Sequence, residues 1–333
     1  MQKKLYSYNE ASCSHPYGLY HTRKRRKATV DRKKRGGKTL IGTYNQSSHN
    51  SEHPTPDTTW QPYDWESKQE VSRLLEREWI LNEFLKGPLP PGLDLPAEAR
   101  VLHIACGPGT WLYLLTLNYP SLQMTGIEKS PYYLQCARHY LAGLDTVTLQ
   151  ENDIGSECAF LSTSTFDLVH LRFLAAEVAP DILPEAVAEL VTSCKRGAYV
   201  YWTECEFPTT NSAACEQLMS SILQGLKTQG RGYAPGCNTL GITASMGSLL
   251  RGAGCRLIQD QAYVLDISAG MFAHHVFVQQ ARVLIQQIRP LVVETGVVRC
   301  EVYDTLAMQA LEQMRQAKFC GALFLRSVVA VAP

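Results

Sequence analysis

Between residues 60 and 206, hydrophobic and polar positions follow two patterns that predict helices and strands in turn. Residues 71–85 carry apolar side chains at a helical period, after the capping-box spacing of Ser67 and Glu70. Further along, strands are expected at 101–105, 123–127, 147–150, 166–171 and 198–203, and helices at 110–118, 131–141 and 185–194. Strands that alternate with short helices predict βαβ units and therefore a parallel sheet covered by helices.

After residue 206 this alternation becomes less regular. Helices are expected at 212–228, 243–250, 272–288 and 302–314, with Pro290 closing the third. Strands are expected at 256–267 and 322–331, and the second of these is apolar and rich in β-branched residues. The last predicted element is therefore a strand that can enter the core sheet.

Composition separates a globular body from a polar first segment. Of the 333 residues, 45% are hydrophobic and 19% charged, and no apolar run is long enough to span a membrane. Residues 1–59 are poor in apolar side chains, so we expect a disordered tail that folding does not need. Its basic clusters at 23–27 and 32–35 suit nucleic acid, anionic lipid or an import receptor, or merely a solvated tail.

Charge is divided unevenly along the chain. Residues 1–50 hold 12 of the 32 basic and two of the 31 acidic residues, which leaves 20 basic and 29 acidic residues, a net charge of −9, on the remainder. The 11 cysteines show no C-x-x-C pair, which predicts reduced thiols and no metal site. A cytoplasmic location is expected. If the host is eukaryotic, the basic tail makes a nuclear location the alternative.

The segment 101–111 carries the strongest chemical signal, because an apolar strand runs into a glycine turn that opens a helix. Gly107 and Gly109 let the backbone approach a ligand closely, and the helix N-terminus favours an anion such as a carboxylate. The third glycine of the dinucleotide fingerprint is replaced by Leu112. This replacement argues against NAD as the ligand.

Polar residues stand at the ends of the next three strands. Glu128 lies 21 residues beyond Gly107, where a carboxylate can accept both hydroxyls of a ribose. Asp153 follows the third strand, where an acid can accept from an adenine amine, and His170 and Arg172 end the fourth beside the predicted cleft. Each residue also has a structural alternative. Glu128 could be a surface acid and Asp153 a turn former, and His170 and Arg172 could serve packing or a salt bridge.

At this spacing the four segments resemble the class I S-adenosylmethionine-dependent methyltransferases. They are most similar to the small-molecule branch that includes the menaquinone/ubiquinone methyltransferases and fungal secondary-metabolism methyltransferase-like proteins. The resemblance covers roughly residues 60–206 and the last strand, with Tyr63-Asp-Trp-Glu66 and residues 166–173 among its motifs. It implies a Rossmann-like, doubly wound α/β sheet of seven strands with an antiparallel last strand. A helical cap and the disordered N-terminal tail would complete the chain.

The resemblance also implies S-adenosyl-L-methionine as cofactor, S-adenosyl-L-homocysteine as product and a small-molecule acceptor. Gly107 and Gly109 would meet the methionine part, Glu128 the ribose, and Asp153 with Ile154 the adenine. The whole expected cofactor site comprises Tyr63, His103, Ala105, Cys106, Gly107, Gly109, Glu128, Lys129, Asp153, Ile154 and His170.

The first strand departs from the family pattern V-L-D-x-G-C-G-x-G. His103 replaces the acid and Ala105 the first glycine. In the cleft, His103 would charge near its ordinary pKa of about 6.5 and weaken cofactor binding. Alternatively it points into the core, because successive strand residues face opposite sides.

Candidate catalytic residues are His170, Arg172, Glu204 and His274, with Glu206 as a further candidate base. A base is needed only if the acceptor must lose a proton. Three alternatives remain open: a macromolecule methyltransferase steered by the tail, a non-catalytic regulator, and an enzyme that uses the sulfonium otherwise. The sequence does not set the oligomeric state, and a homodimer is one state it allows.

The expected organisation follows from these assignments. Residues 1–59 form the basic tail, 60–96 a helical segment, 97–206 the cofactor-binding core, 207–320 a cap over the acceptor with strand six, and 321–333 the last strand of the core sheet.

Overall fold

The computed structural model describes residues 66–154, 164–234, 236 and 238–333. The expectations for the tail at 1–59 and for Tyr63 therefore lie outside the described residues. Within the described residues, no helix combines the length and the apolar character that crossing a membrane requires.

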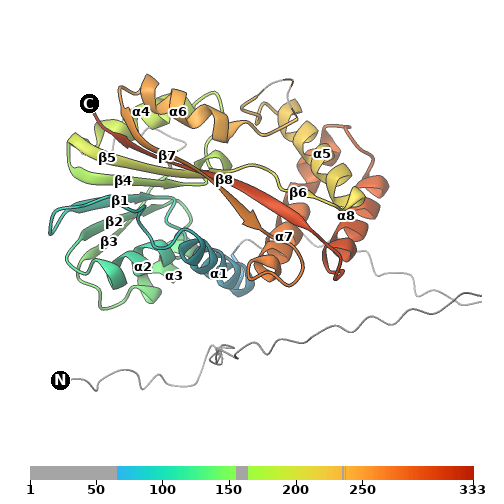
Figure 1. Ribbon diagram of the computed structural model, residues 1–333, viewed down its shortest axis with the longest axis horizontal. Coiled ribbons are helices and arrows are strands. Elements are labelled where there is room, and N and C mark those ends of the chain that lie inside the picture. The colour runs from blue at the N-terminus through green and yellow to red at the C-terminus, as the bar shows by residue number, and fades with distance from the viewer. Residues whose placement is uncertain (1–65, 155–163, 235, 237) are drawn as a thin grey trace, which may run out of the picture. The chain divides into compact units, whose positions relative to one another are not determined.

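A single eight-stranded sheet forms the centre of the described chain (Figure 1). Its order is β3-β2-β1-β4-β5-β8-β6, and β7 pairs with β8. The strands are β1 (Arg100–Ile104), β2 (Gln123–Glu128), β3 (Val147–Glu151), β4 (Phe166–Arg172), β5 (Cys194–Cys205), β6 (Thr209–Thr210), β7 (Arg256–Asp266) and β8 (Gly321–Val331).

Strands β1 to β5 are parallel, whereas β8 runs antiparallel to both β5 and β7. This arrangement confirms the expected Rossmann-like α/β sheet with an antiparallel last strand. The two-residue β6 is an additional strand beside the seven that were expected.

Helices cover both faces of the sheet. They are α1 (Lys68–Phe84), α2 (Thr110–Asn118), α3 (Pro131–Tyr140), α4 (Leu183–Thr192), α5 (Ala213–Thr228), α6 (Ile242–Gly252), α7 (His274–Glu294) and α8 (Cys300–Met314). Successive β5 residues show the two faces: Tyr201 lies in the same buried cluster as Trp111 of α2, and Trp202 in the same cluster as Leu190 of α4 and Met246 of α6. The strand period of two thus places α2 and α3 opposite α4 and α6.

Gly126 of β2 explains why Leu112 can stand where the dinucleotide fingerprint has its third glycine. A Cβ on Gly126 of β2 would lie 2.7 Å from Leu112 Cδ1 and 2.9 Å from Cys106 Sγ. The glycine that lets α2 approach the sheet therefore lies on the neighbouring strand, and the helix keeps a leucine for the core.

Helices α5, α7 and α8 form a separate apolar cluster around Ile285 and Tyr303. The expectation that Pro290 ends a helix is wrong, because α7 continues to Glu294. Val292 in the last turn is fully buried, and a Cβ on Gly225 of α5 would lie 2.9 Å from its Cγ2. This close packing holds the turn that the proline alone would disfavour.

Helix α1 begins as expected, since the Ser67 side chain accepts a hydrogen bond from the Glu70 backbone. Its buried face differs from the expected apolar one. Glu70, Arg73 and Glu78 are buried on it together with Leu81. Charged side chains are seldom buried without a partner, so this face needs a polar surface to contact.

Candidate functional site

The turn after β1 holds the glycines in left-handed conformations. Gly107 has φ 53° and Gly109 φ 85°, and a Cβ on Gly107 would meet no heavy atom within 4 Å. Open space therefore lies beside the backbone at Gly107. Ala105 also has a positive φ, 51°, a conformation that costs an alanine about 1 kcal/mol and that the family's glycine would adopt freely.

Glu128 at the end of β2 is fixed by two backbone donors. Its Oε2 accepts from the Gly107 N–H at 2.8 Å and its Oε1 from the Ser130 N–H at 2.9 Å. Burial raises the pKa of this carboxyl above its ordinary value. A carboxylate offers about four lone pairs, so two remain for a ligand.

A small hollow beside Glu128 gathers the residues that were expected to hold an adenosine. It is lined by Ala105, Ile127, Glu128, Lys129, Asn152, Asp153, Ile154 and Glu177. Lys129 pairs with Glu177 at 2.7 Å at its rim. The structure thus brings Glu128, Asp153 and Ile154 together, as their positions at adjacent strand ends predict. We call this the adenosine hollow.

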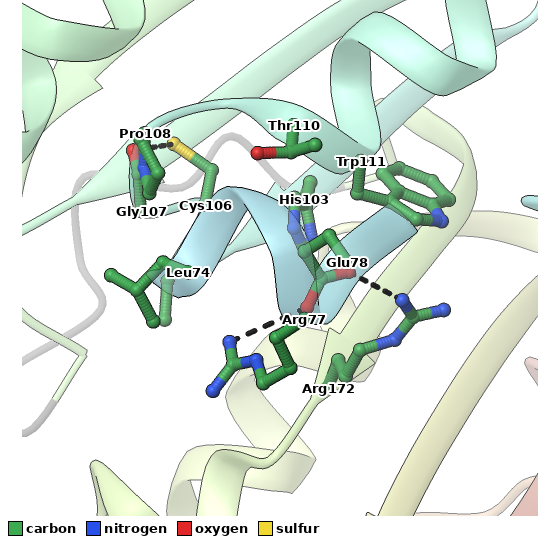
Figure 2. Close-up of a pocket in the computed structure, with 11 residues that line it drawn as sticks. Leu74, Arg77, Glu78, His103, Cys106, Gly107, Pro108, Thr110, Trp111 and Arg172 are labelled. Atoms are coloured by element: carbon green, nitrogen blue, oxygen red, sulfur yellow. Dashed lines mark hydrogen bonds and ion pairs between the residues drawn. The ribbon is translucent and has the colours of Figure 1, made fainter. Parts of the chain in front are cut away.

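A second hollow lies between α1, β1, α2 and β4 (Figure 2). Its lining consists of Leu74, Arg77, Glu78, His103, Ala105, Cys106, Gly107, Pro108, Thr110, Trp111 and Arg172. Because Ala105 lines both, the two hollows adjoin along the glycine turn. We call this one the arginine hollow.

Glu78 stands between two guanidinium groups in the arginine hollow, as Figure 2 shows. Its Oε2 lies 2.5 Å from Arg172 Nη1 and its Oε1 3.3 Å from Arg77 Nη2. Burial alone would raise the pKa of Glu78, but the charges of Arg172 and Arg77 outweigh it and lower this pKa. Glu78 is therefore a carboxylate at neutral pH.

Sequence reasoning missed Arg77 and Glu78. The signal was present: Glu78 follows Val71 and Leu74 and precedes Leu81 on the helical stripe that was expected to be apolar. A charge on such a stripe marks a polar contact within the fold.

His103 lies among aromatic rings. Its ring centroid is 4.7 Å from that of Trp111 and 4.6 Å from that of His170, and its Nδ1 lies 3.0 Å from His170 Nδ1. Burial lowers the pKa of His103 to about 4. The expectation that it charges near pH 6.5 is therefore wrong, because the buried ring stays neutral.

An aspartate at position 103 is expected to destabilise the fold. Both this variant and His103→Asn lose the ring contacts, but only the aspartate buries a carboxylate among the rings of Trp111 and His170, at a cost of about 2 to 4 kcal/mol relative to His103→Asn. Thermal unfolding of both variants measures this difference. The difference in stability should shrink as the pH is lowered, because protonation removes the charge of the introduced carboxylate. A His103→Asp variant as stable as His103→Asn would contradict the argument.

Other candidate residues lie outside both hollows. His170 is fully buried and stacks on Trp111 with ring centroids 3.8 Å apart. His274 at the start of α7 lies 2.9 Å through Nδ1 from the Ile267 carbonyl. Arg172 is the candidate catalytic residue that the structure brings to the arginine hollow.

The two acids after β5 have structural partners. Glu204 Oε1 accepts from Trp202 Nε1 at 2.8 Å and from the Ala175 N–H at 3.1 Å, and burial raises its pKa to about 7. Glu206 accepts from the Gly241 and Thr243 N–H groups, which caps α6. Among the described residues, no group of three or more His, Cys, Asp or Glu side chains is arranged to bind a metal.

Residues 101–197 match the family model described as a methyltransferase domain. Over this part the chain is thus similar to methyltransferase domains, in line with the expected resemblance to the class I S-adenosylmethionine-dependent methyltransferases. A trans-aconitate 2-methyltransferase from Methylobacterium nodulans is 32% identical over 93 residues, which are 28% of this chain and 33% of that relative. The chain thus matches about a third of that relative's length.

Two solved structures are similar to this chain at low identity. A putative methyltransferase from Bacillus halodurans is 12% identical with a TM-score of 0.47, covering 72% of this chain and 95% of the other. Phosphoethanolamine N-methyltransferase 2 from Haemonchus contortus is 16% identical with a TM-score of 0.43, covering 78% and 52%.

The cofactor of this class, S-adenosylmethionine, suits the residues present. Glu128 keeps two lone pairs, as many as a ribose has neighbouring hydroxyls, and open space lies beside the backbone at Gly107. The adenosine hollow thus offers the acceptors that a nucleoside needs.

Proposed function

We propose that this protein transfers the methyl group of S-adenosylmethionine to a small-molecule acceptor by direct displacement. The observation that carries the proposal is Glu128, a buried carboxylate held by two backbone donors beside an open glycine turn. Bound S-adenosylmethionine supplies a methyl group already activated on a sulfonium sulfur. The protein's own work is then alignment and exclusion of water.

Each side of the glycine turn has its own part in this proposal. Glu128 accepts from the ribose hydroxyls, while Asp153 and Ile154 contact the adenine. In the arginine hollow, the rings of Trp111 and His103 pack against each other and against the buried ring of His170. Arg172 and Arg77 give this hollow a positive electrostatic potential.

The lining of the arginine hollow contains no group suited to take a proton at neutral pH. The His103 pKa is lowered to about 4, Glu78 is held between two arginines, and burial raises the pKa of the Cys106 thiol. An acceptor atom that carries no proton at neutral pH, such as a carboxylate oxygen, fits this lining best.

Two further observations favour a small acceptor. Outside residues 1–50 the chain carries a net charge of −9, which opposes binding to nucleic acid. The relative named trans-aconitate 2-methyltransferase acts on a small molecule by its name. A nucleic-acid or protein acceptor steered by the basic tail is the alternative.

A non-catalytic protein that retains the fold is the second candidate function. It is favoured by His103, which replaces the family's acid, and by the Glu78–Arg172 pair in the adjoining hollow. Such a protein would still bind the cofactor through Glu128 but would yield no methylated product.

One experiment separates these functions. The full chain is incubated with methyl-labelled S-adenosylmethionine and an extract of its host, and the products are separated by size and mass. A labelled small molecule is the expected result. A labelled polymer would support the macromolecule alternative, and absence of label with retained cofactor binding would support the non-catalytic one.

A further inference from the structure

An ion pair spans the mouth of the adenosine hollow. Nζ of Lys129, the residue after β2, lies 2.7 Å from Oε2 of Glu177, in the segment between β4 and α4. Because β1 lies between β2 and β4 in the sheet, the pair crosses over the end of β1. The Lys129 and Glu177 side chains are 48% and 34% exposed, whereas Glu128 and Ile154 in the same lining are buried. The pair therefore lies on the solvent side of the hollow, over the groups to which we assign the nucleoside.

Charge holds Lys129 in this position. Burial alone would lower the pKa of Lys129, but its hydrogen bond to Glu177 and the charges of Asp153 and Glu128 outweigh burial and raise this pKa. Lys129 is therefore a cation at neutral pH. Within the described lining of the hollow it is the one basic residue, and Glu177 is the carboxyl group that it reaches across the end of β1.

The backbone on the Lys129 side of the pair is fixed. The neighbouring Ser130 donates its N–H to Glu128 Oε1 at 2.9 Å, and the Ser130 hydroxyl caps α3 by accepting from the Tyr133 N–H at 3.3 Å. Lys129 therefore stands between the end of a strand and the start of a helix, and neither can shift without breaking these hydrogen bonds.

The backbone on the Glu177 side is fixed as well. Ala175 donates its N–H to Glu204 Oε1 at 3.1 Å, and the Tyr233 hydroxyl donates to the Val178 carbonyl at 2.8 Å. These contacts tie the segment to β5 and to the chain between α5 and α6. The freedom that remains at the mouth of the hollow belongs to the two long side chains, and exposed side chains change rotamer within nanoseconds.

From this arrangement we infer that Lys129 and Glu177 form a clasp, which opens to admit the nucleoside part of the cofactor and closes over it afterwards. The inference rests on the proposed binding of S-adenosylmethionine in the adenosine hollow. Ion pairs near the surface are weak, so the clasp slows entry and exit about two- to fivefold and does not block them. Both residues are positioning residues, because the pair acts on the path of the ligand and on its hold, not on the reacting atoms.

Rapid-mixing kinetics of S-adenosylhomocysteine binding to the full chain test the clasp. Lys129→Met and Glu177→Gln each remove one charge of the pair and keep a side chain of similar length. Each variant should raise both the association and the dissociation rate constant about two- to fivefold and leave Kd within about twofold of the wild type. The double variant should be no faster than either single variant, because one substitution already opens the clasp.

Salt provides a readout that a merely structural role would not change. Raising the ionic strength from about 0.05 to 0.5 M shortens the Debye length and weakens an exposed ion pair. The wild-type rate constants should therefore rise toward those of the variants, whose own rate constants stay the same. S-adenosylhomocysteine carries no net charge at neutral pH, so screening does not change its attraction to the protein at long range.

Lys195→Met is the matched control. Lys195 is 45% exposed and pairs with Asp167 at 2.7 Å, but neither residue lines the adenosine hollow. The rate constants of this variant should equal those of the wild type at each salt concentration.

The clasp is refuted if Lys129→Met and Glu177→Gln bind and release S-adenosylhomocysteine as fast as the wild type does. A change in only one of the two rate constants, or additive effects in the double variant, would show separate contacts with the ligand and would also refute it. If only adenosine binds the wild type, its rate constants decide about the clasp and the proposed function fails. Binding of neither nucleoside contradicts both, whereas the expected kinetics without methyl transfer would contradict the proposed function alone.

Discussion

Replacement of Glu128 by alanine is expected to weaken binding of S-adenosylhomocysteine by about a hundredfold or more, because two hydrogen bonds to ribose hydroxyls are lost. Each hydrogen bond from a ribose hydroxyl to a carboxylate contributes about 1.5 to 3 kcal/mol. The substitution also leaves the Gly107 and Ser130 N–H groups without their acceptor, so the glycine turn loses its fixed position. Calorimetric titration of the full chain measures the effect.

Glu151→Ala provides the matched control. Glu151 pairs with Glu128 in register on the neighbouring strand β3, but it is exposed and lines neither hollow. Its removal should leave the affinity unchanged. Equal affinities of Glu128→Ala and wild type would refute the assignment of Glu128 to the ribose.

The same carboxyl gives cofactor binding a defined pH dependence. Burial raises the pKa of Glu128 above its ordinary value, and only the ionised form accepts freely from two hydroxyls. Affinity for S-adenosylhomocysteine should therefore fall as the pH is lowered through this raised pKa. Glu128→Gln should bind more weakly at neutral pH and show a smaller change with pH.

Glu204 is expected to make the wild-type fold less stable as the pH rises. Burial raises its pKa to about 7, against an ordinary value of 4.5, so the folded chain holds a proton that the unfolded chain releases. The contribution of this group to the free energy of unfolding is highest at acid pH. It falls by about 2 kcal/mol between pH 5 and pH 8.

Glu204→Gln tests this dependence, because the amide does not titrate and its oxygen can still accept from Trp202 and Ala175. Urea unfolding at pH 5 and pH 8 gives the two free energies for wild type and variant. The variant should lose less stability over this interval by about 2 kcal/mol. Equal losses would mean that Glu204 is ionised in the folded protein throughout.

The sequence predicted the sheet and the adenosine hollow because both depend on local signals. Short apolar runs and turn glycines mark the strands, and Glu128, Asp153 and Ile154 follow strand ends that a parallel sheet brings to one edge. Which roles these residues have remains a prediction.

The arginine hollow could not be predicted in the same way. It depends on a helix, α1, that is separated from Arg172 by almost a hundred residues, and on the orientation of its charged face. The surroundings of His103 likewise come from tertiary contacts with Trp111 and His170. Pro290 shows the same limit, since α7 continues past it and the buried Val292 of the last turn packs closely against Gly225 of α5.

The position of β8 has a consequence for biosynthesis. The eighth strand in chain order lies between β5 and β7, and Leu325, Val328 and Ala330 are fully buried there. While the ribosome is still synthesising residues 321–331, β5 has an open edge and β7 lacks the strand with which it pairs. The nascent chain therefore exposes two unpaired strand edges until this segment emerges, which makes that interval one in which chaperones have an edge to protect.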